Sequence, residues 1–147
     1  MAEQIIDLDT AKLAKEKGFM YSYFEYHNLE WWEPNLMWYG KYRYTDKYRL
    51  IGSMFTDTSQ NIEQYYPDSF IQAPTQSLLQ KWLREIHNIH VEVNVEYENA
   101  TEEIWDDIYN VSIIRKGYYA EDTDDTYEKA LEKGLLHSLR LLSIKND

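Results

Sequence analysis

The chain has 147 residues, 44% of them hydrophobic, which suits one domain with a buried core, and we expect a single domain over residues 1–147. It has no cysteine, no run of about eighteen apolar residues and no apolar N-terminal stretch, which argues against disulfides, a membrane-spanning helix and a signal peptide. The net charge of −11 argues against general nucleic-acid binding, because phosphate contacts need a basic surface.

The first predicted element is a helix over residues 8–17, which Asp7 or Asp9 can cap and which Gly18 can end. After it the apolar period changes to two, and the stretches "MYSYFEY", "LMWYGKYRY" and "YRLIGSMF" are typical of strands. A three-residue turn at residues 45–47 joins the second and third of these strands as a hairpin.

The three-residue turn also fixes which residues of the hairpin face each other. On one face it puts apolar side chains, which we expect in the core: Trp38, Tyr42, Tyr44, Leu50 and Met54. On the other face it puts Arg43 directly opposite Arg49, beside Tyr39, and two like charges in that position destabilise a bare sheet. This pair requires an anion, supplied either by an acidic loop at 98–107 or 121–128 or by a ligand with phosphate or carboxylate groups.

In the second half, residues 57–74 are predicted as a connector, and the clearest helix follows from Pro74–Thr75 to Asn88. The next stretch, "IHVEVNVEY", alternates strictly, with a row of residues that face in: Ile89, Val91, Val93, Val95 and Tyr97. An acidic loop leads to its antiparallel partner, "IYNVSIIRKG". The stretch "DDTYEKALEKGLLHSLRLLSI" forms a last helix, with Asp125 as its N-cap.

These elements follow the order α-β-β-β-α-β-β-α. Hairpins imply antiparallel pairing, and amphipathic helices need a sheet face against which to bury their apolar side chains. We therefore predict an α+β fold with two layers, in which a mainly antiparallel sheet of about five strands carries the helices on one face.

Three separate motifs indicate a relationship to known sequences: "LAKEKGF", "APTQSLLQKWLREIHNIHVEV" and "YEKALEKGLLHSLRLL". In this order they resemble a family of small phage and prophage proteins of gut bacteria, Bacteroides-type phages above all, for which no function is known. The resemblance covers about half of the chain and leaves out the aromatic region 20–60. It implies a viral or mobile-element origin and a place in the cytoplasm of a bacterial host cell, and it brings no catalytic residue with it.

Motifs for metal binding and catalysis are weak. His87 and His90 are a close histidine pair, but Asn88 is expected to end the helix between them, and the acid-rich "AEDTDDTYE" lacks the glycine and the terminal glutamate of a calcium loop. The chain has no nucleophile elbow and no glycine-rich phosphate loop. We therefore expect no metal, no cofactor and no catalytic residue, and we consider an enzyme less favoured than a binding protein.

Acidic residues are concentrated in two stretches. Residues 92–107 hold seven acids and residues 121–128 hold five, with no Lys or Arg in either. One interpretation is a binding surface that imitates the phosphate charge of DNA and occupies basic grooves of host proteins. The other is solvation, because net negative charge alone keeps a small protein soluble.

Two functional hypotheses follow. The first is a non-enzymatic phage or prophage accessory protein that binds a host protein, a phage protein or itself, for host-factor inhibition or self-assembly. Trp31 and Trp32 would form that interface together with an acidic surface, because adjacent residues of a strand cannot both enter a core and exposed Trp is typical of interfaces. The alternative for these two residues is simple packing across a sheet edge. The alternative is a small-ligand module that holds an anionic aromatic molecule such as a nucleotide, with these binding residues: Tyr39, Arg43 and Arg49.

Overall fold

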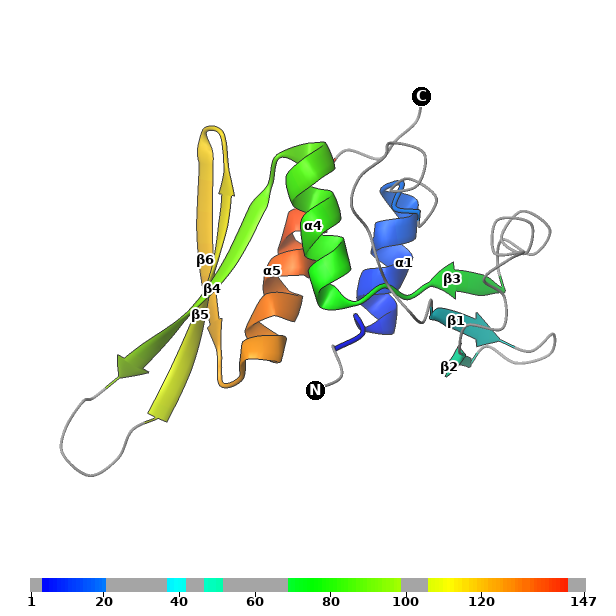
Figure 1. The fold of residues 1–147 in the computed structure, drawn as a ribbon, viewed down its shortest axis with the longest axis horizontal. Helices are drawn as coiled ribbons and strands as arrows, with labels where there is room; N and C mark the ends of the chain where they lie inside the picture. The colour runs from blue at the N-terminus through cyan, green and yellow to red at the C-terminus, as the bar shows by residue number, and fades with distance from the viewer. Residues whose placement is uncertain (1–3, 21–36, 42–46, 52–68, 99–105, 143–147) are drawn as a thin grey trace. The chain divides into compact units, whose positions relative to one another are not determined.

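The computed structural model describes residues 4–20, 37–41, 47–51, 69–98 and 106–142. These residues form two compact units, which we name the N-terminal unit, built on Ile5–Thr75, and the C-terminal unit, built on Gln76–Ser143. Each unit has its own three-stranded antiparallel sheet, so the chain is α+β as predicted (Figure 1). The described strands form two sheets, whereas the sequence predicted one sheet of about five strands. The single domain over 1–147 stays a prediction.

The N-terminal unit begins with helix α1, Leu8–Glu16, in agreement with the predicted helix. Its buried face is formed by small residues, Ala11 and Ala14 among them. Gly18 follows the helix at a φ of 98°, a left-handed conformation that favours glycine, and the N–H of Phe19 donates to Ala14 O at 2.9 Å. The predicted glycine stop is therefore confirmed.

The sheet of the N-terminal unit has the strand order β2-β1-β3, with β1 at Trp38–Lys41, β2 at Tyr48–Ile51 and β3 at Phe70–Gln72. Strand β3 lies in the stretch predicted as a connector, so that prediction is wrong there. A strand of three residues is too short to show an alternating pattern, and β3 is recognised only by its pairing with β1. The predicted strand "MYSYFEY" lies outside the described residues.

The predicted register of the hairpin is wrong. Trp38 pairs with Ile51 and Gly40 pairs with Arg49, so the opposition of Arg43 and Arg49 is not formed. The prediction assumed a three-residue turn, whereas residues 42–47 separate the paired ends of β1 and β2.

Burial of the predicted core residues of this hairpin is mixed. Trp38 is fully buried, as predicted, whereas Leu50, also predicted in the core, is 42% exposed. The shifted register explains Leu50, because it now lies opposite Tyr39, on the other face from Trp38. The remaining predicted core residues lie outside the described residues: Tyr42, Tyr44 and Met54.

The C-terminal unit contains five elements: α4 at Gln76–His87, β4 at His90–Glu98, β5 at Asp106–Arg115, β6 at Tyr118–Asp124 and α5 at Tyr127–Leu141. Its sheet has the order β4-β5-β6, and both pairings are antiparallel. The two helices and the first two strands confirm the sequence prediction. Strand β6 was not predicted, because its acidic sequence resembles a solvated loop. It follows β5 after a turn in which Gly117 has a φ of 79°.

Helix α4 ends as predicted at Asn88, whose φ of 54° is left-handed, a conformation that Asn tolerates better than most residues. The N–H of Ile89 then donates to Leu83 O at 3.0 Å, so the chain turns directly from the helix into β4. The start of α4 is tied to α5 by buried Gln76, whose Nε2 donates to Glu128 O at 2.9 Å and to Glu132 Oε1 at 3.0 Å.

Helix α5 packs across all three strands of its sheet, with α4 beside it on the same side (Figure 1). The core between helix and sheet contains Val91, Val111 and Ile113, all buried. The row of β4 residues that was predicted to face inward is buried only in part. Val91 lies in the core, whereas Val95, further along the strand, is 44% exposed. None of the helices in the described part of the chain is both long and apolar enough to span a membrane.

The N-cap of α5 is Thr126, not Asp125 as predicted. Thr126 Oγ1 accepts a hydrogen bond from the N–H of Lys129 at 3.1 Å. The carboxylate of Asp125 instead pairs with the ammonium of Lys129 at 3.2 Å. Both residues are good caps, and the sequence alone did not separate them.

Candidate functional site

The candidate site is the face of the β4-β5-β6 sheet that α4 and α5 leave open, which we name the outer face. In Figure 1 this sheet is seen nearly edge-on, and both helices lie on one side of it. Among the described elements of this unit, none covers the other side. Its exposed side chains come from two edge strands: Glu92 and Asn94 on β4, and Tyr119, Glu121 and Thr123 on β6. Antiparallel pairing puts these residues on one face.

A hydrogen-bond network connects the side chains in the middle of the outer face. The hydroxyl of Tyr119 donates to Glu121 Oε1, and Asn110 Nδ2 donates to Glu121 Oε2 at 3.2 Å. Ser112 Oγ lies within hydrogen-bond distance of Tyr119 Oη, at 3.4 Å. Both oxygens of the Glu121 carboxylate are thus held by neighbouring side chains, which fixes the direction of the carboxylate.

The outer face carries a negative charge, because the carboxylate of Glu121 is held in its ionised form. The hydrogen bond from Tyr119, and after it the one from Asn110, lowers the pKa of Glu121 below its usual value. Its carboxylate therefore remains ionised at neutral pH. Ser112 pairs with Glu121 on one side and with Glu92 on the other, so two acidic residues flank one small residue across three strands.

The remaining acids of β6 lie on the side that faces α5 and have partners there. Lys133 of α5 pairs with Asp124 at 3.2 Å and with Asp122 at 3.8 Å, and its ammonium donates to Thr123 O at 2.7 Å. The N–H of Asp125, and to a lesser extent Lys133, lowers the pKa of Asp124. The stretch 121–128, predicted as an acidic loop, is therefore a strand and a helix start, with its charges divided between two faces.

This division bears on the calcium interpretation of "AEDTDDTYE". Consecutive residues of a strand point to opposite faces, so Glu121 and Asp122 cannot converge on one ion. In the described part of the chain, no group of three or more metal-ligating side chains is placed to hold a metal. His87 and His90 are separated by the helix end, and the ring of His87 packs edge-on against Trp82 with 4.6 Å between ring centroids.

In the described part of the chain, the structure does not bring together the residues that were predicted to bind. Trp31, Trp32 and Arg43 lie outside the described residues. Tyr39 and Arg49 are described, but Arg49 lies opposite Gly40, so the two side chains are on different faces of the sheet. The hydroxyl of Tyr39 donates to Ile6 O at 2.6 Å, which ties this ring to the chain before α1.

Sequence reasoning missed the outer face because it missed β6. The signal that could have found it is the alternation in "YYAEDTD", where Tyr119, Glu121 and Thr123 fall at every second position. Acidic residues are rare in strands, so the acidic composition of this stretch favoured a loop even though its pattern alternates. Without β6, Tyr119 and Glu121 could not be placed beside Ser112.

Comparison with known proteins gives no match: no family model, no curated protein and no solved structure is similar to this chain.

Proposed function

We propose that this chain is a non-enzymatic accessory protein that acts by protein–protein binding, and that the outer face binds a basic segment of its partner. The phage or prophage origin and the bacterial host cytoplasm belong to the same proposal and rest on the sequence resemblance. The observation that supports the binding role is a sheet face without a covering element in its unit, whose central carboxylate is held ionised by Tyr119 and Asn110.

Charge complementarity identifies the kind of partner. Glu92 and Glu121 are exposed acids on either side of Ser112, and no Lys or Arg of the described strands shares the middle of this face with them. A Lys- or Arg-rich segment would be attracted to the face, and complementary charge would set its register. Tyr119 adds a large contact surface, because its side chain is 59% exposed and Tyr is enriched among residues that contribute most to binding.

An enzyme is less well supported at this site. A general acid needs a pKa near the working pH, whereas the pKa of Glu121 is lowered. The nucleotide-binding alternative loses its predicted site, since Tyr39 and Arg49 are on different faces.

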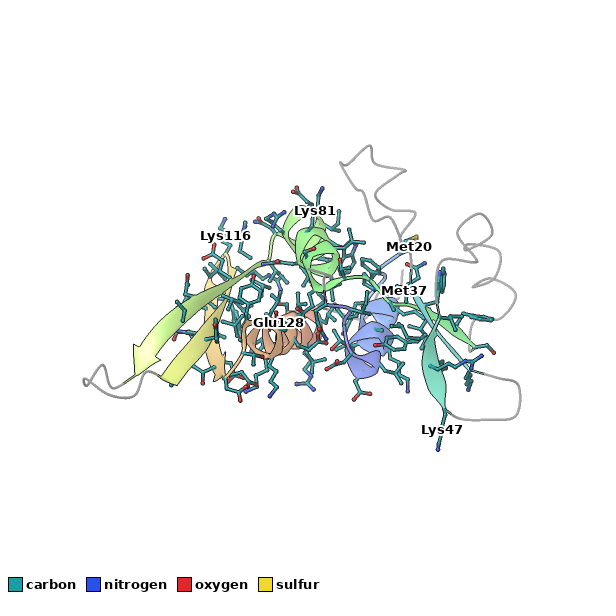
Figure 2. The ribbon with its side chains drawn as sticks, turned by 60° about the horizontal axis from the view of Figure 1, so that its bottom comes forward. Met20, Met37, Lys47, Lys81, Lys116 and Glu128 are labelled. Atoms are coloured by element: carbon teal, nitrogen blue, oxygen red, sulfur yellow. The ribbon has the colours of Figure 1, made fainter. Side chains whose placement is uncertain are left out.

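Binding to short synthetic peptides with graded Lys and Arg content tests this proposal, with dissociation constants measured by fluorescence anisotropy on the full chain. We expect the tightest peptides to be basic, and Glu121→Gln, Glu92→Gln and Tyr119→Ala each to weaken them about tenfold, the size of one good polar or aromatic contact. The matched control is Glu128→Gln, which changes the net charge equally but lies on α5 (Figure 2).

Two results contradict the proposal. One is that Glu128→Gln weakens binding as much as Glu121→Gln, which would show that net charge and not this face attracts the peptides. The other is that the tightest peptides carry no basic residues. Thermal unfolding of each variant confirms that a loss of binding does not come from a loss of fold.

A further inference from the structure

The N-terminal unit has a charged surface of opposite sign, centred on the ring of Tyr48. The ammonium of Lys12, from α1, lies over this ring at 5.1 Å from its centroid. The ammonium of Lys41, from β1, lies over the same ring at 5.3 Å. We name Lys12, Lys41 and Tyr48 the basic cluster.

Helix α1 and the paired strands β1 and β2 bring these residues together. Lys41 and Tyr48 are directly opposite in the β1–β2 pairing, so their side chains leave the sheet on the same face. Helix α1 approaches this face, as the hydrogen bond from Tyr39 to Ile6 O shows, and brings Lys12 to it. The cluster therefore depends on the observed register and could not be derived from the predicted one.

The two ammonium groups repel each other, and the ring compensates only in part. A cation over a tyrosine ring gains about 0.5–1 kcal/mol at an exposed site. Asp9 and Glu16 lie one turn to either side of Lys12 on α1, yet among the described residues neither Lys12 nor Lys41 forms an ion pair. Two ammonium groups held at one ring, with no ion-pair partner among the described residues, are suited to an external anion.

The chemistry of the cluster favours phosphate over an aromatic base. The ring of Tyr48 already carries two ammonium groups, so recognition depends on charge and not on stacking. Ammonium groups are compact donors that bind phosphate oxygens well, and an anion with several oxygens can contact both of them. We propose that the basic cluster is a binding site for the phosphate group of a small phosphorylated ligand.

Isothermal titration of the full chain with pyrophosphate, at fixed low ionic strength, tests this site. We expect saturable binding with one site per chain, weakened about tenfold by Lys12→Gln and by Lys41→Gln, which is the loss of one charge-assisted hydrogen bond. Lys12→Arg keeps the charge and should retain most of the affinity.

The control variant is Lys47→Gln, which removes the same charge from the same unit. Lys47 is exposed directly before β2, and its side chain points away from the ribbon (Figure 2). It should leave the affinity within about twofold, since it does not contact the ring of Tyr48. Equal weakening by Lys47→Gln and Lys41→Gln would overturn the site, as would the absence of pyrophosphate binding to the unchanged chain.

Two further ligands distinguish the source of the phosphate. Inorganic phosphate should compete with pyrophosphate and bind more weakly, because it has fewer oxygens. Adenosine, which has a base and no phosphate, should not compete, and competition by adenosine would overturn the assignment to phosphate. The outer face lies in the other unit, so Glu121→Gln should leave pyrophosphate binding unchanged, and failure of either proposal can be recognised separately.

Discussion

Gly134 of α5 lies so close to β5 that a Cβ atom at this position would come within 2.5 Å of Val111 Cγ2. The same Cβ atom would lie 2.8 Å from Val91 Cγ1. Both valines are buried, so neither can move into solvent. The missing side chain therefore sets the distance between the helix and its sheet.

Gly134→Ala should destabilise the C-terminal unit although Ala favours a helix. Helix propensity alone would stabilise the chain by about 1 kcal/mol. Overpacking of a filled core costs about 1–3 kcal/mol, and the contact distances put this change at the upper end. We expect a net loss of about 1–2 kcal/mol in the free energy of unfolding, measured by urea denaturation.

The control for this change is the double variant Gly134→Ala with Val111→Ala. The second substitution removes Val111 Cγ2, the atom that the new Cβ would approach most closely. The double variant should lose less stability than the sum of the two single changes. Additive losses would show that the contact between Gly134 and Val111 does not limit the packing. Gly117→Ala serves as a second comparison, because a Cβ atom there meets no other atom within 4 Å and only the positive φ opposes it.

The elements with strong periodic patterns were predictable from the sequence. Helix α4 buries one regular row of residues and strand β4 alternates strictly in sequence, so hydrophobic period alone identifies them. The left-handed residues Gly18 and Asn88 ended the helices where their chemistry indicated.

The pairing of strands and the acidic strand were not predictable. The register of β1 and β2 depends on the loop between them, and a shift by an odd number of residues moves Arg49 to the other face. One of the two side-chain partners of Glu121 is also nonlocal, since Asn110 reaches it only through the β5–β6 pairing. The candidate site and the basic cluster therefore both depend on contacts that no local pattern contains.

Thr126→Ala should destabilise α5 more than Asp125→Ala. The first change removes the side-chain acceptor of the Lys129 N–H, and loss of such a cap costs about 1 kcal/mol. The second removes an exposed i,i+4 ion pair with Lys129, worth about 0.3–0.5 kcal/mol. Thermal unfolding of the two variants ranks them, and a larger loss for Asp125→Ala would restore Asp125 as the functional cap.

Lys133→Ala should expose the edge of β6. Its ammonium occupies Thr123 O and pairs with Asp124, so it covers a carbonyl that edge strands leave free. Because the side chain is 44% exposed, we expect a loss of only about 0.5–1 kcal/mol. Hydrogen exchange should show faster exchange in β6 than in β4, and Lys129→Ala is the control on the same helix. Unchanged protection of β6 would contradict this role.

Acidification should weaken the network of the outer face in a defined direction. The pKa of Glu121 is lowered in the folded chain by Tyr119 and Asn110, so the folded state favours the carboxylate. The stability that this group contributes is present above its ordinary pKa of 4.5 and is lost as the pH falls through the lower, folded value.

Tyr119→Phe and Asn110→Ala should each raise the pKa of Glu121, with the larger rise for Tyr119→Phe. Carbon NMR of the side-chain carboxyl groups measures this pKa directly, and Ser112→Ala, which touches Tyr119 but not the carboxylate, is the control. A pKa that stays low in Tyr119→Phe would mean that another group holds the charge of Glu121, and the phenol would then lose its place in the network.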